Sequence, residues 1–268
     1  MSESRTFETE IEMDAPVESV WKALTEADEL TRWFPLEAKV NPGVGGSVEM
    51  SWTKYSVWDS RIEIWEPNRR FRSVGAPKFA DGSSNGVTPL ILDYILEARG
   101  GKTVLRLVHS GFRSGPDWDN EYFESFHRGW DFELRGLRHY LERHAGERRL
   151  VAWAKADFRI PFDEAWARLM GPDAVLKQGS LDGLQEGDRY SVTSTTGDAF
   201  NGIVQVNTPS KQFSGTVEHQ NDSLLRVKID PASEGGEATV WLSTYGVPQD
   251  EVNAFERRWN DVLQELFS

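Results

Sequence analysis

Alternation of apolar and polar residues at a period of two predicts several strands in this chain. The pattern is clear at residues 47–52, 90–97 and 105–109, where every second residue is apolar, except His109, and most residues between are polar. A similar pattern opens each half of the chain, at residues 6–13 and 152–160. Strands of this kind have one face for a core and favour an antiparallel sheet.

A period near 3.6 predicts helices between and after these strands. Short helices are expected at residues 16–24 and 161–169, each with a proline in its first turn, where the missing N–H costs nothing. Another short helix is expected at residues 28–34. Long helices are expected at residues 121–143 and 250–267, with an apolar stripe along one face.

The two halves of the chain repeat one order of elements. Residues 16–24 resemble residues 161–169, and the aromatic stripe of the first long helix reappears in the second, 129 positions later. The counterpart of the helix at 28–34 looks truncated, near residues 172–176. Ordered similarity of this kind indicates a tandem duplication. We expect two domains, residues 1–146 and 147–268.

Each half is therefore predicted to be an α+β domain, a curved antiparallel sheet wrapped around its long C-terminal helix. The inner face of the first long helix carries a mostly aromatic stripe: Phe123, Phe126, His127, Trp130, Leu134, Leu137 and Leu141. A curved sheet around such a helix encloses a volume, which either side chains or a ligand fill.

Five loose motifs, in order and at matching spacing, carry a family resemblance over residues 5–144. They are Pro16 to Trp21, Leu30 to Phe34, Gly45-Gly46-Ser47, Gly129-Trp130 and Tyr140-Leu141. With them the chain resembles the START-like, or SRPBCC, superfamily with its helix-grip fold, and within it relatives of the C-terminal domain of the activator of heat-shock protein 90 ATPase. The second half resembles it more weakly. The resemblance implies a cavity between sheet and long helix that holds small apolar or aromatic molecules.

Composition excludes several function classes. The 268 residues carry a net charge of −13 and a pI near 4.9, which argues against nucleic acid and anionic membranes as partners. The absence of cysteine excludes disulfides, thiol nucleophiles and cysteine-ligated zinc. No window approaches the roughly 18 apolar residues of a membrane span, and the polar N-terminus does not resemble a signal peptide. We expect a cytoplasmic protein.

Large aromatic residues are the candidate ligand-binding residues. Such side chains bind flat apolar molecules at little entropic cost. For any one of them alone core filling is the favoured interpretation, but eight on converging faces favour a cavity, because bulky rings pack irregularly. The candidates are Trp33, Trp52, Trp58, Phe71, Tyr94, Phe123, Phe126 and Trp130.

Two histidines are predicted to face the same interior. His109 shares a strand face with Leu105 and Leu107, and His127 follows Phe126 on the long helix. Together they could act as an acid–base pair, with Asp131 orienting His127 and Tyr94 donating to a substrate oxygen. The alternative, which we favour, is that they orient a polar group of a ligand without chemistry. The second half has Thr244 and Glu256 at these two positions.

No metal or cofactor site is expected. Residues 117–121 resemble the start of a calcium loop, but Phe123 and Arg128 stand where its turn glycine and last glutamate belong. We expect that segment to be a loop leading into the long helix, with Trp118 as a gate, and residues 75–89 to be a mobile loop.

Three functions compete at this point. The leading hypothesis is non-catalytic binding of a small apolar or aromatic ligand. The second is an enzyme similar to polyketide cyclases or dehydratases that uses His109 and His127, and the third is a chaperone-associated interaction module.

Trp241 and Tyr245 lie on the outer face of their predicted strand and could mediate a contact between domains or a homodimer.

Overall fold

The computed structural model divides the chain into two compact units, residues 1–146 and 147–268. We treat each unit as a domain and describe it by itself. The described residues are 4–53, 56–78, 88–113, 117–171, 175–179, 181, 183–232 and 234–268.

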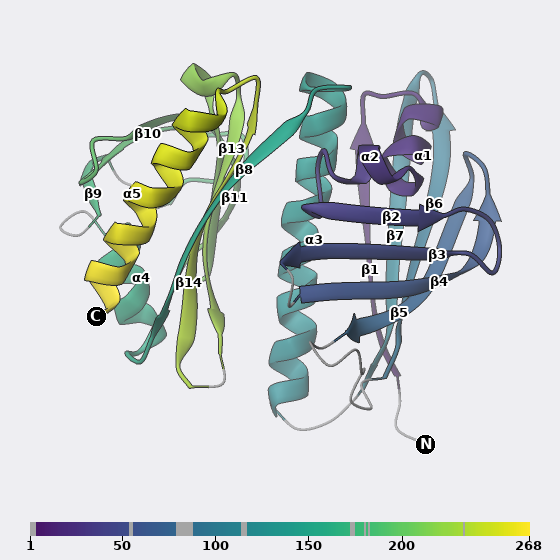
Figure 1. Ribbon diagram of the computed structural model, residues 1–268, viewed down its shortest axis with the longest axis horizontal. Coiled ribbons are helices and arrows are strands. Elements are labelled where there is room, and N and C mark those ends of the chain that lie inside the picture. Colours follow the sequence, from purple (N-terminus) through teal and green to yellow (C-terminus); the bar gives the residue numbers. More distant parts are fainter. Residues whose placement is uncertain are drawn as a thin grey trace. The chain divides into compact units, whose positions relative to one another are not determined.

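The first domain is a seven-stranded antiparallel sheet with one long helix, α3, along it and two short helices (Figure 1). The strand order is β1-β7-β6-β5-β4-β3-β2, so every strand after the first pairs with its successor, and β7 returns to pair with β1. The elements are β1 (Ser4–Met13), α1 (Val17–Thr25), α2 (Ala27–Leu30), β2 (Glu37–Asn41), β3 (Ser47–Thr53), β4 (Ser56–Glu66), β5 (Arg70–Lys78), β6 (Leu90–Arg99), β7 (Lys102–Arg113) and α3 (Asp117–Arg143).

The second domain repeats this topology. Its sheet has the order β8-β14-β13-β12-β11-β10-β9, which is the first order with every number raised by seven. A long helix, α5, again follows the last strand (Figure 1). The elements are β8 (Arg149–Phe158), α4 (Phe162–Met170), β9 (Leu176–Gln178), β10 (Arg189–Ser194), β11 (Ala199–Thr208), β12 (Gln212–Val217), a 3-10 turn (Glu218–Gln220), β13 (Ser223–Pro231), β14 (Gly236–Tyr245) and α5 (Gln249–Phe267).

Two helix-grip domains of the predicted α+β class are therefore confirmed, and the repeated strand order supports the duplication. The apolar stripes of the long helices form the core, as the periodicity predicts. Leu134 and Leu137 of α3 and Leu105 and Leu107 of β7 are at most 2% exposed. In the second domain, α5 buries the corresponding stripe of Val252, Phe255, Trp259 and Leu263.

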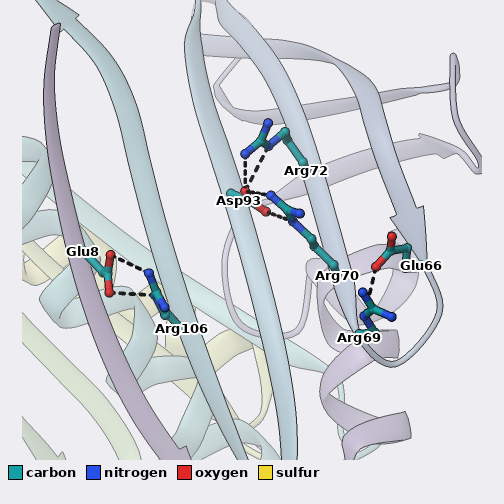
Figure 2. A network of polar contacts seen from close by, with 7 residues as sticks. All are labelled: Glu8, Glu66, Arg69, Arg70, Arg72, Asp93 and Arg106. Carbon is teal, nitrogen blue, oxygen red and sulfur yellow. Dashed lines mark hydrogen bonds and ion pairs between the residues drawn. The ribbon is translucent and has the colours of Figure 1, made fainter.

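The opposite face of the first sheet is charged (Figure 2). Asp93 alternates with the inward Leu92 and Tyr94 on β6, so its carboxylate lies on this outer face. Arg70 and Arg72 of β5 both donate to it, with the shortest bonds at 2.7 and 2.6 Å. Burial would raise the pKa of Asp93, but the two guanidinium groups outweigh it and hold the pKa below 3.8. The strand predicted at residues 90–97 thus carries one ionic residue, Asp93, on its outer face.

Some local predictions are wrong. Residues 117–121 are not a loop, because α3 already begins at Asp117, and the side chain of Trp118, predicted as a gate, lies outside the described part. The helix expected at residues 28–34 is only the single turn Ala27–Leu30 followed by turns. Residues 75–78 belong to β5 rather than to a loop, and residues 79–87 lie outside the described part. Leu176 begins a strand instead of lying in a helix, and residues 172–174 are not among those described.

No helix in the described part of the chain is long and apolar enough to cross a membrane. Within the same residues, no cluster of three or more histidine, aspartate or glutamate side chains could hold a metal ion.

Candidate functional site

His109 lies in the middle of a row of side chains on the inner face of the first sheet. It pairs across the strands with Phe7 of β1 on one side and with Leu92 of β6 on the other. All three side chains are buried. The strand alternation that puts Leu105 and Leu107 in the core thus also carries a polar ring into it.

The long helix supplies the hydrogen-bond partner of this histidine. Trp130 of α3 donates its indole N–H to Nδ1 of His109, at 3.0 Å. Because the indole nitrogen is only a donor, Nδ1 must be the unprotonated nitrogen, and the proton of the neutral ring sits on Nε2. The sheet residue and the helix residue together fix one tautomer.

The second ring nitrogen of His109 has no such partner. His109 is 1% exposed, and its Nε2 makes no hydrogen bond with any described residue. Burial lowers the pKa of His109 to about 3, so the ring is neutral near pH 7. A neutral imidazole that gains its second proton only far below pH 7 can donate a hydrogen bond through its one N–H, but it is poorly suited to acid–base chemistry near neutral pH.

Aromatic rings surround this imidazole. Its centroid lies 4.7 Å from that of Phe112, 5.3 Å from that of Phe7 and 5.4 Å from that of Phe126, all in edge-to-face arrangements. Such contacts are favourable for the rings but give Nε2–H at most a weak acceptor. The free N–H therefore lies in an almost wholly apolar enclosure.

A second part of the cluster lies around Trp130. Its ring meets Tyr94 edge to face at 6.0 Å, and Tyr94 is parallel to Phe71 at 5.8 Å. Tyr94 and Phe71 are buried. Burial raises the pKa of the Tyr94 hydroxyl, which stays protonated throughout the physiological range.

Half-buried aromatic residues form the outer part of the same cluster. Phe34, Trp52, Trp58 and Phe126 are all partly exposed. Phe34 contacts Trp130 at 5.2 Å and Trp52 at 5.1 Å, and Phe126 contacts Trp58 at 6.2 Å. Phe34 contacts Trp130, and Phe126 contacts His109 at 5.4 Å, so two partly exposed rings touch the buried His109–Trp130 pair.

Two predicted residues fill the core instead of facing the imidazole directly. Trp33 is 3% exposed and donates its indole N–H to the Ala23 carbonyl at 2.8 Å, which fixes it against α1. Phe123 is also buried, between Phe112 at 5.1 Å and Phe7 at 5.7 Å. Both still belong to the continuous set of ring contacts that joins all the predicted aromatic residues.

Three rings that contact His109 or Trp130 are absent from the predicted residues, namely Phe7, Phe34 and Phe112. Phe7 was available from the alternation of the opening strand, and Phe34 from its place beside Trp33. Phe112 was not, because simple alternation puts it on the face opposite His109. A bulge at Gly111, whose φ is +96°, shifts the register between β7 and β1 and returns Phe112 to the inner face.

The prediction that His127 faces the interior is wrong. His127 is exposed, and its ring only approaches that of Phe7, at 5.1 Å. One residue along a helix turns a side chain by about 100°, so a neighbour of the half-buried Phe126 can lie outside the core. The predicted orienting contact is replaced as well, since Asp131 pairs with Arg135 one turn later. The structure thus does not assemble an acid–base pair from His109 and His127.

The second domain satisfies the corresponding positions internally. Trp259 of α5 stands where Trp130 stands in α3, and donates its indole N–H to Oδ2 of Asp198 at 3.1 Å. Thr244 occupies the His109 position and donates to the Leu150 carbonyl. Glu256 accepts the backbone N–H of Trp153 at 2.9 Å. No donor comparable to Nε2–H of His109 is left at these positions.

The two aromatic residues predicted as an outer contact surface differ in exposure. Trp241 is half-buried, lies 5.1 Å from the ring of Trp153 and donates to Ser243 Oγ at 2.9 Å. Tyr245 is buried, at 1% exposure. A contact through these residues stays a prediction.

The first domain matches the model of a known protein family. Residues 14–142 match the family described as activator of Hsp90 ATPase homolog 1-like protein. A search of curated proteins finds no match.

Several solved structures are similar in fold. The Aha1 dimer from Colwellia psychrerythraea is 20% identical, with 53% of this chain and 99% of that chain covered and a TM-score of 0.44. DynU16, from the dynemicin biosynthetic locus, is 16% identical over 98% of this chain and 97% of its own, with a TM-score of 0.44. The di-domain ARO/CYC protein BexL, from the BE-7585A biosynthetic pathway, is 16% identical over 98% and 96%, with a TM-score of 0.43. At these TM-scores the likeness carries no functional conclusion.

Proposed function

Because the first domain belongs to the activator of Hsp90 ATPase homologue 1-like family of START-like proteins, we propose that it binds a small, flat, apolar or aromatic molecule between its sheet and α3. The binding is non-catalytic. The ligand leaves the site chemically unchanged.

The observation that carries the proposal is the state of His109. A buried donor without an acceptor destabilises a folded protein by about 1–3 kcal/mol, so such groups are uncommon unless something else uses them. Here the donor lies among aromatic rings, and Phe126, a half-buried ring, contacts the imidazole directly. An apolar molecule that displaces or slides between these outer rings would reach it.

An enzyme of the cyclase or dehydratase kind has less support. Such chemistry needs a group that exchanges a proton near neutral pH, whereas burial keeps His109 neutral and His127 lies exposed, away from a paired arrangement. A chaperone-associated role rests on the family description alone. We therefore place both behind ligand binding.

Native mass spectrometry of the protein purified from its own host tests the proposal. We expect a reproducible mass above the calculated one, lost on denaturation. Trp52→Leu, which alters a half-buried ring of the cluster, should reduce the ligand-bound fraction. Trp166→Leu, at a half-buried tryptophan of α4 in the second domain, is the matched control and should not.

An empty wild-type protein that also shows no mass shift with flavonoid, lipid and polyketide compounds would overturn the proposal. Turnover of a bound compound, lost in His109→Phe, would instead favour the enzyme.

A further inference from the structure

Given the proposed function, on which this step rests, the state of His109 determines what chemical group the ligand must present to it. The imidazole offers a single group, the Nε2–H, because Nδ1 already accepts the indole N–H of Trp130 at 3.0 Å. Nε2 is buried and has no partner among the described residues. The site therefore supplies one donor and requires one acceptor.

Several ligand chemistries conflict with this arrangement. A metal ion needs an unprotonated ring nitrogen, and the only one is occupied by Trp130. An amine or amide N–H would place a second donor against Nε2–H. A plain hydrocarbon would fill space between the rings but would leave the donor unsatisfied.

The charge of the acceptor is constrained by the surroundings. The imidazole is bordered by Phe7, Phe112 and Phe126 at ring distances of 4.7 to 5.4 Å. A carboxylate moved into such surroundings would lose most of its hydration in exchange for one neutral N–H. A neutral carbonyl oxygen loses much less and accepts the same bond. The flat rings also favour a planar molecule, which can stack or meet their edges.

We propose that the ligand of the first domain is a neutral aromatic carbonyl compound, a flat ketone or quinone, whose oxygen accepts a hydrogen bond from Nε2–H of His109. His109 is then a binding residue. Trp130 is a positioning residue, because it acts by holding the proton on Nε2.

Two rigid probes of nearly the same shape test this. 9-Fluorenone carries a carbonyl where fluorene carries a methylene, so the pair isolates the acceptor. Titrations that follow intrinsic tryptophan fluorescence give both dissociation constants for the full chain. We expect wild type to bind fluorenone about tenfold more tightly than fluorene, the factor that one net hydrogen bond supplies.

His109→Phe keeps a ring and removes the donor. In this variant the ratio of the fluorene to the fluorenone dissociation constant should therefore fall to about one. His219→Phe changes an exposed histidine of the second domain and should keep the wild-type ratio. The infrared carbonyl band of bound fluorenone should move to lower wavenumber in wild type and in His219→Phe, but not in His109→Phe.

The failures of the two proposals are distinguishable. Equal affinities for the probes in wild type would overturn the carbonyl proposal and leave apolar binding intact. A ratio that persists in His109→Phe would overturn it too, because another group would then be the donor. If wild type binds neither probe, the carbonyl proposal fails, and native mass spectrometry of the host-purified protein then decides whether the proposed function fails with it.

Nitrogen NMR of wild type provides a measurement that needs no folded variant. We expect Nε2 of His109 to be protonated and Nδ1 not, with the Nε2 proton moving downfield on addition of fluorenone but not of fluorene. In Trp130→Phe, the two tautomers should mix. If the chemical shift of the Nε2 proton does not change when fluorenone binds, the proposal is overturned. The N–H would then keep its contact with a phenyl ring instead of donating to the ligand.

Discussion

The indole of Trp130 and the imidazole of His109 share one buried hydrogen bond, 3.0 Å long, that joins the long helix to the sheet in the first domain. The bond sets the direction of the remaining donor, because only Nε2 of His109 keeps a proton in the neutral ring. The packing of the helix on the sheet and the polarity of the candidate site therefore depend on the same two residues.

A double-mutant cycle should detect this coupling. Trp130→Phe leaves a buried Nδ1 unpaired, and His109→Phe leaves a buried indole N–H unpaired, so each change destabilises the fold. The double variant loses both partners, and the penalties should fail to add by about 1 kcal/mol. Urea unfolding of the full chain measures each free energy. Strictly additive effects would mean that the bond does not form in solution.

The neutral state of His109 predicts a pH dependence of stability. Its pKa is about 3 in the fold and about 6.5 unfolded, so the unfolded chain gains a proton first as the pH falls. The contribution of neutral His109 to the free energy of unfolding is complete above pH 6.5. It is lost between pH 6.5 and 3, at about 1.4 kcal/mol per pH unit.

The measurement is the free energy of unfolding at several values in that pH range. The curve of His109→Phe should be flatter than that of wild type, and His219→Phe should keep the wild-type slope. Parallel curves for wild type and His109→Phe would contradict a neutral buried His109.

The sequence predicts much of this site and misses part of it for definable reasons. The inward position of His109 follows from its alternation with Leu105 and Leu107, and the place of Trp130 follows from the helical stripe. Their mutual bond does not, since it depends on how helix and sheet dock. The inward position of Phe112 could not be predicted, because the bulge at Gly111 breaks the alternation of β7. The exposure of His127 could not be predicted either, because periodicity does not define where the buried face of a helix ends.

The buried carboxylate of the outer face gives a separate prediction. Asp93→Asn removes the charge that Arg70 and Arg72 share, and should destabilise the chain by about 2 kcal/mol at pH 7. Glu8→Gln, at the exposed pair with Arg106 in Figure 2, should have a much smaller effect.

The lowered pKa of Asp93 determines how the stability that its ion pairs supply depends on pH. The stabilisation is present above pH 3.8 and is lost as the pH falls through the folded-state pKa. Acid titration of unfolding should therefore show a wild-type loss below pH 3.8 that Asp93→Asn lacks. An equal loss in both proteins would contradict the ion pair.

The second domain should take no ligand of this kind. Asp198, in the turn between β10 and β11, accepts from Trp259 at 3.1 Å and from Arg258 at 2.6 Å, and so ties that turn to α5. The hydroxyl of Thr244 donates a hydrogen bond to the Leu150 carbonyl and is therefore not available to a ligand. The rings of Phe200, Phe255 and Trp259 lie 5.8 to 6.2 Å apart and are each at most 3% exposed.

We therefore expect native mass spectrometry with 9-fluorenone to give one ligand per chain. Asp198→Ala removes the acceptor that Thr196, Arg258 and Trp259 share, and should destabilise the second domain by about 2 kcal/mol, because the indole N–H of Trp259 is left without its partner. It should leave the stoichiometry and the affinity of the first domain unchanged. Two ligands per chain in wild type, with one lost in Asp198→Ala, would show instead that the turn helps to form a second site.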